Sequence, residues 1–98
     1  MSIPKLHVLA LLALETTPIT QEVLVDTAEL RGLKETPQSL RSRLVELERA
    51  GYVRRTDRHG ISRYGRPCWR WQLTSQGREF VGELINAAIS NGKEMKTL

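Results

Sequence analysis

Arginine is concentrated in one part of this chain, between positions 41 and 70. Of fifteen basic residues, nine lie there, and all nine are arginines: Arg41, Arg43, Arg49, Arg54, Arg55, Arg58, Arg63, Arg66 and Arg70. With three acidic residues the stretch carries a formal charge of +6, while six basic and eight acidic residues elsewhere give −2. A planar guanidinium group with five N–H donors suits phosphate groups and nucleobase edges. The charge alone also fits a solvated basic surface. Whether the arginines bind a ligand therefore depends on the helices and strands that carry them.

The rest of the composition argues against catalysis and metal binding. The sequence contains no Gly-rich phosphate loop, no Ser-based nucleophile motif and no recognisable Cys–His pairing. Cys68, His7 and His59 lack the spacing of metal ligands. We therefore expect no enzyme activity, no cofactor and no metal ion. His7 lies in an apolar segment and is expected to be buried or to lie in an interface.

Length and cysteine content indicate one small cytoplasmic domain. A chain of 98 residues has room for a single core. One cysteine cannot form an internal disulfide bond and fits a reducing compartment. No segment approaches the roughly 20 apolar residues of a membrane helix. The apolar run at 6–14 lacks the cleavage site of a signal peptide, so we expect neither export nor membrane contact.

The spacing of apolar residues predicts three helices in the first half, at 4–14, 21–31 and 37–50. Thr20 and Thr36 stand where N-cap residues belong, and Gly32 and Gly51 stand where helices end. The residues expected to face the core are Leu24, Ala28 and Leu30 in the second helix and Leu40, Leu44 and Leu47 in the third.

After Gly51 the pattern changes to that of strands, at 52–57 and 68–73, joined by a loop at 58–67. Trp69, Trp71 and Leu73 alternate inward and are expected to pack in the core, although exposed tryptophans could stack on bases. A last helix is predicted at 76–90, followed by a frayed tail at 91–98, so that residues 1–90 form one domain. Its apolar face contains Phe80, Val81, Leu84, Ile85 and Ala88.

Two segments resemble known regulators. Residues 39–55, SLRSRLVELERAGYVRR, are similar to the recognition helix and first wing strand of winged helix-turn-helix proteins of the MarR, PadR and ArsR kind. Residues 65–77, with the motifs GRP and LTSQG, resemble the wing exit and the start of the final helix in that superfamily. The resemblance implies a mainly α fold with a small β-hairpin (α+β), in the order α-α-α-β-wing-β-α. It also implies a small transcriptional regulator of repressor type that binds double-stranded DNA sequence-specifically, without the metal ligands of ArsR-type sensors.

In this fold the third helix enters the major groove, where each base pair shows a distinct pattern of donors and acceptors. Arg41 or Arg43 is expected to reach guanine and Gln38 adenine, while hydroxyl groups bind phosphate. The candidate DNA-binding residues of this helix are Thr36, Gln38, Ser39, Arg41, Ser42, Arg43 and Arg49. The alternative for Arg43 and Arg49 is an ion pair with an acidic residue on the same helix or a neighbouring one.

The hairpin is expected to act as the wing, with Arg55, Arg58, Arg63 and Arg66 as candidate DNA-binding residues. Gly65, Arg66 and Pro67 form the tripeptide found at the core of AT-hook proteins, in which an extended arginine enters a narrow A·T minor groove. The alternative is that glycine and proline merely shape the end of the hairpin.

The first helix is apolar nearly all round, which indicates a partner as well as an internal core. We expect a homodimer through the first and last helices that binds two DNA half-sites about one helical turn apart. Whether a small-molecule effector exists is left open. Two other functions fit the same features: a protein-interaction adaptor, and a replication or recombination accessory DNA binder of plasmid or phage type.

Overall fold

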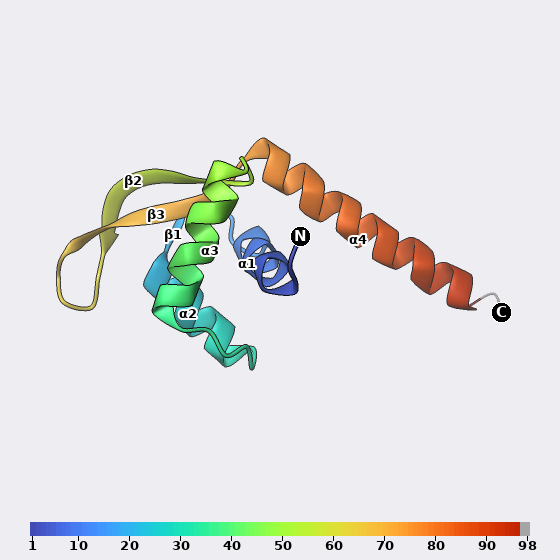
Figure 1. The fold of residues 1–98 in the computed structure, drawn as a ribbon, viewed down its shortest axis with the longest axis horizontal. Coiled ribbons are helices and arrows are strands. Elements are labelled where there is room, and N and C mark those ends of the chain that lie inside the picture. The colour runs from blue at the N-terminus through green and yellow to red at the C-terminus, as the bar shows by residue number, and fades with distance from the viewer. Residues whose placement is uncertain (97–98) are drawn as a thin grey trace.

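Residues 1–96 are described by this computed structural model, the side chains as far as residue 90, and they form four helices and a three-stranded sheet (Figure 1). The elements are α1 (Ile3–Ala13), β1 (Ile19–Thr20), α2 (Gln21–Leu30), α3 (Pro37–Arg49), β2 (Val53–Ile61), β3 (Pro67–Leu73) and α4 (Ser75–Lys96). The predicted order and the α+β class are confirmed, with β1 as an additional strand. β1 is not among the predicted strands because two residues are too few to show an alternation.

The core lies between α1, α2 and α3. Leu9, Leu24, Leu40 and Leu44 are completely inaccessible to solvent, because each of these helices turns one apolar stripe towards the others. Leu47 is also buried, which confirms the predicted stripe of α3. Full burial of one such side chain contributes about 1.5–3 kcal/mol. The inner face of α3 is therefore fixed, and its polar face must point outward.

Local chemistry fixes the ends of α3. The Thr36 hydroxyl accepts a hydrogen bond from the Ser39 backbone N–H (3.1 Å), and Pro37 occupies the first turn, where no N–H is needed. Gly51 follows the last turn with φ +89°, a left-handed conformation that glycine adopts without strain. The predicted N-cap at Thr20 is also confirmed, because its hydroxyl accepts from the Val23 N–H (3.3 Å).

The sheet is antiparallel, in the order β1-β3-β2. Ile19 lies opposite Trp71 and Thr20 opposite Arg70, so β1 connects the base of the β2–β3 hairpin to the start of α2. The hairpin extends beyond the helices as a wing, on the opposite side of the molecule from α4 (Figure 1).

The wing strands are longer than predicted. β2 continues to Ile61 rather than to residue 57, past two shifts of register, and only residues 62–66 remain as the wing loop. Gly60 makes this possible, since a side chain there would collide with the Thr20 methyl group and the Cys68 carbonyl oxygen. The loop predicted at 58–67 was too long because the two register shifts hide the alternation of the strand.

Two residues predicted in the core are exposed. Leu30 is 89% exposed, because it lies on the opposite face of α2 from Leu24 and Ala28. Trp69 is 40% exposed, whereas Trp71 is buried. Both tryptophans lie on one face of β3, but Trp69 is nearer the wing loop, where the hairpin extends beyond the helices (Figure 1). The face of β3 on which the two tryptophans lie was therefore predicted correctly, but the distance that the core extends along the strand was not.

Helix α4 leaves the core soon after it starts. Val81 is buried and Phe80 packs on Tyr52 with 5.1 Å between ring centres, but Leu84, Ile85 and Ile89 are 41%, 54% and 53% exposed. The backbone of α4 continues to Lys96, beyond the predicted end at residue 90. The tail expected at 91–98 thus overlaps α4, and residues 97–98 lie outside the described part of the chain.

A small junction joins the wing to α4. The Thr74 hydroxyl donates to the Gly51 carbonyl (2.6 Å) and accepts from the Gly77 N–H (3.1 Å), while the Thr74 N–H donates to the Tyr52 carbonyl (3.1 Å). A Cβ atom on Gly77 would overlap the Tyr52 carbonyl oxygen. This contact explains the glycine that ends the LTSQG motif.

We expect Gly77→Ala to destabilise the protein by about 1–3 kcal/mol, because the new methyl group must push the Tyr52 backbone away. Gly82→Ala is the matched control on the same helix. Nothing lies within 4 Å of a Cβ atom there, so alanine should stabilise by about 0.5–1 kcal/mol. Urea denaturation of both variants measures the difference, and equal effects at the two glycines would contradict the junction's role.

Candidate nucleic-acid interface

The outer face of α3 is polar and open to solvent. Gln38, Arg41, Ser42 and Arg49 are exposed, and together with Val45 and Glu46 they line a shallow hollow along the helix. Ser39 is half-buried, and the Thr36 hydroxyl is occupied as the N-cap. The structure thus presents four of the seven predicted recognition-helix residues as an accessible row, with Ser39 and Thr36 at its N-terminal end.

Arg43 is the seventh, and it is occupied by an ion pair. Its guanidinium group contacts the Glu35 carboxylate, a residue just before α3, and its side chain is only 25% exposed. The sequence left open an ion pair as the alternative role of Arg43. The structure shows such a pair, with its partner in the loop before α3 rather than on a helix. Lys5 of α1 binds Glu46 of α3 in a similar way (2.7 Å), and this contact lowers the pKa of the Glu46 carboxyl. These pairs hold α3 in place.

Arg55 and Arg58 lie at the base of the wing on either side of exposed aromatic surface. Arg55 Nε donates to Glu48 (3.1 Å), and its guanidinium group lies 4.9 Å from the Trp71 ring centre. The Arg58 guanidinium group lies 5.6 Å from the centre of the Trp69 ring. Arg55 is thus held by α3 and by an aromatic face, whereas Arg58 is exposed and stacks on one ring.

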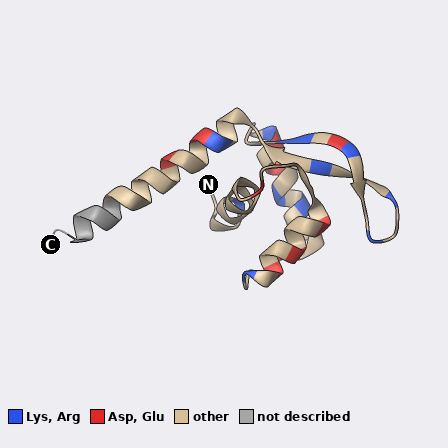
Figure 2. Ribbon diagram, turned by 180° about the vertical axis from the view of Figure 1, so that it is seen from behind, with Lys and Arg blue, Asp and Glu red and all other residues tan. Residues whose placement is uncertain are grey.

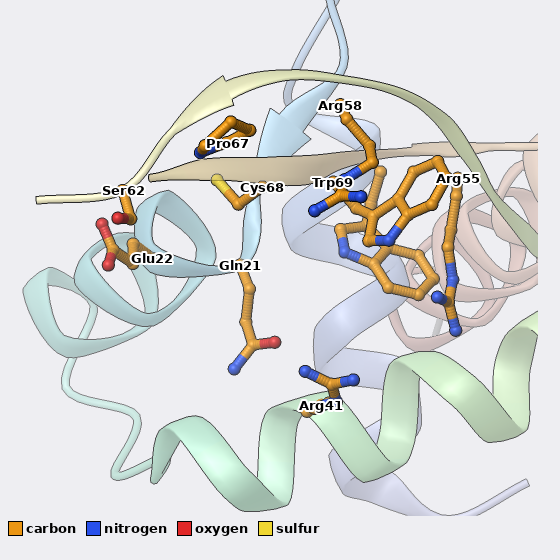
Figure 3. A pocket seen from close by; sticks show the side chains of 10 residues that line it. Gln21, Glu22, Arg41, Arg55, Arg58, Ser62, Pro67, Cys68 and Trp69 are labelled. Carbon is orange, nitrogen blue, oxygen red and sulfur yellow. The ribbon is translucent and has the colours of Figure 1, made fainter. Parts of the chain in front are cut away.

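A cavity of about 410 Å³ separates α3 from the wing (Figure 3). Arg41 enters it from α3, Gln21 from the start of α2, and Arg58 and Trp69 from the wing. Gln21 is oriented by a hydrogen bond from its amide N–H to the Pro37 carbonyl (2.7 Å). Positive charge, hydrogen-bond donors and a flat apolar surface thus meet in one open site.

The wing loop carries the last two candidates. Arg66 is exposed, and its backbone N–H donates to the Ser62 hydroxyl (3.1 Å). Gly65 before it has φ +76°, so the glycine of the GRP tripeptide is needed for the turn. Arg63 instead faces α2, where it contacts Glu22 and Asp26. Basic positions follow α3, both wing strands and the wing loop, while α2 shows acidic ones (Figure 2).

Asp57 and Arg70 form a cross-strand pair inside the wing. Arg70 donates two hydrogen bonds of 2.7 Å to the two carboxylate oxygens, and the His59 backbone N–H donates a third (2.9 Å). These bonds hold the pKa of Asp57 far below its usual range, with Arg70 as the main cause. Arg70 is therefore the arginine that stabilises the irregular part of the wing.

Sequence reasoning missed three residues of this surface. Gln21 and Glu22 start α2 and look like ordinary helix residues; no sequence signal brings them to the wing. Trp69 is predicted in the core, but it lies nearer the wing loop than the buried Trp71, where the hairpin extends beyond the helices. Within the described residues there is no cluster of His, Cys, Asp and Glu that could hold a metal ion. None of the described helices is long and apolar enough to cross a membrane.

No protein-family model matches the chain, and no curated protein matches its sequence. Solved structures do match. A PadR-like transcription factor from Bacteroides fragilis has a TM-score of 0.73 and 19% identity over 96% of this chain and 89% of its own. A PadR family regulator from Clostridium difficile has a TM-score of 0.67 and 16% identity over 93% and 94%. Streptococcus pneumoniae FabT in complex with DNA has a TM-score of 0.71 and 18% identity over 99% of this chain but 61% of its own.

At such identities the likeness shows the fold and leaves the ligand to be argued from the site. The chain has the winged helix-turn-helix fold, and the resemblance to PadR-type proteins is found at the level of structure. The chain spans about three fifths of the length of the FabT chain.

We expect Asp57→Asn to lower the melting temperature at neutral pH and to have a progressively smaller effect in acid. The folded-state pKa of Asp57 is depressed, so its stabilisation is present above the unfolded value near pH 4 and is lost as pH falls through the folded value. Thermal denaturation from pH 7 to pH 2 measures this. In an Arg70→Ala background most of the pH-dependent part should be lost, with a remainder from the hydrogen bond of the His59 N–H; an undiminished pH-dependent part would contradict the role of Arg70.

Proposed function

We propose that this protein binds double-stranded DNA and acts as a transcriptional regulator. The observation that carries the proposal is a row of exposed arginines without an acidic partner: within the described residues, Arg41, Arg49, Arg58 and Arg66 make no ion pair. Arg54 makes none either, but its guanidinium group donates to Gln72 (3.2 Å). The arginines of the row extend from α3 through the cavity to the wing loop, while the paired arginines hold the elements. Unneutralised guanidinium groups along a path of this kind suit a phosphate backbone.

The exposed face of α3 has the composition of a major-groove reader. Gln38 can pair with adenine, and Ser42 and Arg49 can bind bases or phosphates along the groove. Arg43 is committed to Glu35, so we no longer assign it to a base. Gln38, Ser42 and Arg49 on the outer face of α3 are exposed, as a groove-filling helix requires.

We propose a role for Arg41 other than the expected guanine contact. It turns into the cavity between α3 and the wing, opposite Arg58 and Trp69. A duplex that receives α3 in one groove and the wing in the next must pass its backbone across this cavity. We therefore assign Arg41 and Arg58 to a phosphate of that backbone and Arg66, at the loop, to the minor groove.

The exposed apolar stripe of α4 supports a homodimer. Leu84, Ile85 and Ile89 are at least 41% exposed and lie on the same side of the helix as the buried Val81. Exposed apolar surface of this kind marks an interface. A two-fold dimer through α4 and α1 would place two α3 helices for half-sites about one turn apart, and repression would follow from occupation of the operator.

The named neighbours support the regulatory role, since PadR-like transcription factors and a DNA-bound FabT share the fold. A replication or recombination role would use the same contacts. We favour transcription because two of these neighbours are transcription regulators, and the genomic position of the operator would distinguish the two roles.

Selection from a random duplex library should yield a palindromic motif. Gln38→Ala should then weaken binding to the selected duplex and spare a scrambled one, because it removes base contacts. Arg41→Ala should weaken binding to both by similar factors and reduce the slope of log K against log salt by about one, because it removes a phosphate contact. Fluorescence anisotropy across a salt series measures both effects.

Arg78→Ala serves as the control, since this exposed arginine lies on α4, away from the cavity. An equal loss in Arg78→Ala and Arg41→Ala would mean that only net charge matters. If selection enriches no motif and no variant changes duplex affinity, the DNA proposal fails and the protein-interaction adaptor becomes the better explanation.

Ile85→Glu should convert the dimer to a monomer in sedimentation experiments, because a charge in an apolar interface is costly to bury. Ser90→Glu adds the same charge on the other side of α4 and should leave the dimer intact. A wild-type protein that is monomeric at micromolar concentration, or a dimer that persists in Ile85→Glu, would contradict the α4 interface.

A further inference from the structure

The wing loop, residues 62–66, holds its own shape. The Ser62 N–H donates to the Arg66 carbonyl and the Gly65 N–H to the Ser62 carbonyl, both at 2.8 Å. The Ser62 hydroxyl accepts from the backbone N–H groups of Tyr64 (3.3 Å) and Arg66 (3.1 Å). Four internal hydrogen bonds and a left-handed glycine thus define the turn without help from another element.

A separate set of contacts joins the loop to α2. The Arg63 backbone N–H donates to Glu22 Oε2 at 3.0 Å, across 41 residues of sequence. The Arg63 guanidinium group lies 3.8 Å from Glu22 and 3.7 Å from Asp26. Glu22 points towards the loop at Ser62 in Figure 3, and α2 shows as an acidic segment in Figure 2. These two carboxylates, the acidic latch, occupy the arginine that the sequence assigns to DNA.

The contacts between Arg63 and the acidic latch are weak enough for a phosphate group to replace them. The Arg63 side chain is 60% exposed and Asp26 58%, and both ion pairs are longer than a direct hydrogen bond. Exposed pairs of this type contribute about 0–1 kcal/mol each. A phosphate group offers the same guanidinium two parallel, charge-assisted hydrogen bonds and releases counterions as well. A duplex can therefore displace the carboxylates.

We propose that Glu22 and Asp26 compete with DNA for Arg63 and so set the affinity of the wing, an inference that rests on the proposed DNA binding. In the free protein the acidic latch neutralises Arg63. In the complex Arg63 leaves it for a backbone phosphate, and the cost of breaking these contacts is subtracted from the binding free energy. A duplex whose backbone does not reach the loop leaves the latch intact and gains nothing from Arg63.

The opposite role would be an anchor that positions the wing for DNA. The internal hydrogen bonds of the loop argue against it, because Ser62 and Gly65 maintain the turn whether or not Glu22 is present. Removing the carboxylates should therefore free the Arg63 side chain without disordering the loop. If the carboxylates compete with DNA, their removal should tighten duplex binding. If they anchor the wing, their removal should weaken it.

The test is the affinity of Glu22→Gln/Asp26→Asn for the selected duplex between about 50 and 200 mM salt. We expect binding to tighten by about 3- to 10-fold at the low end, the equivalent of one or two exposed ion pairs. The slope against log salt should steepen, because the two carboxylates released in the wild-type complex take up cations and so offset part of the counterion release from DNA, which the variant cannot do. In an Arg63→Ala background the same substitutions should leave the slope unchanged and change the affinity by less than 2-fold.

Glu29→Gln is the matched control, since it removes a carboxylate from the same helix and Glu29 makes no described contact with Arg63. Weaker binding in the double variant would show an anchor and overturn the inference. An equal gain with and without Arg63, or an equal gain in Glu29→Gln, would show general repulsion and also overturn it. Absence of duplex binding by the wild-type protein would instead defeat the proposed function itself.

Discussion

Burial of one leucine stripe, Leu40, Leu44 and Leu47, is the constraint on which the surface of this protein depends. These side chains fix the rotation of α3 about its axis, because turning the helix would expose all three to water. Every outward residue of α3 is then placed by helical geometry. Gln38 and Ser42 face solvent and Arg41 faces the wing without any contact of their own to hold them there.

Ion pairs divide the arginine cluster into two groups, one with acidic partners and one without. Arg43, Arg55 and Arg70 are matched with Glu35, Glu48 and Asp57, and these pairs connect α3 and the wing strands to their surroundings. The unpaired group remains available to a ligand. A high net charge therefore does not mean that every arginine is available to bind a ligand. In this fold, about half of the arginines in the cluster form ion pairs that help to position the elements carrying the others.

Much of the fold could be predicted from the sequence because its signals are local. The stripe of α3, the caps at Thr20 and Thr36 and the glycine after α3 each depend on a few neighbouring residues. The acidic partners of the arginines could not be predicted from the sequence. Arg63 and Glu22, for example, are 41 residues apart and come into contact only in the folded chain. Trp69 shows the same limit: alternation gives the face of a strand, but burial depends on whether the helices reach that part of the strand.

The placement of α4 and the wing at opposite ends of the core has a consequence for assembly (Figure 1). A partner that covers the apolar stripe of α4 leaves α3, the cavity and the wing loop uncovered in both subunits. Dimer formation and duplex binding therefore need not compete for surface. Coupling between them would have to pass through the junction of Tyr52, Thr74 and Gly77, which joins the end of α3 and the base of the wing to the first turn of α4. Because Gly77 leaves no space there for adjustment, a change in the direction of α4 would be transmitted to the wing rather than absorbed at the joint.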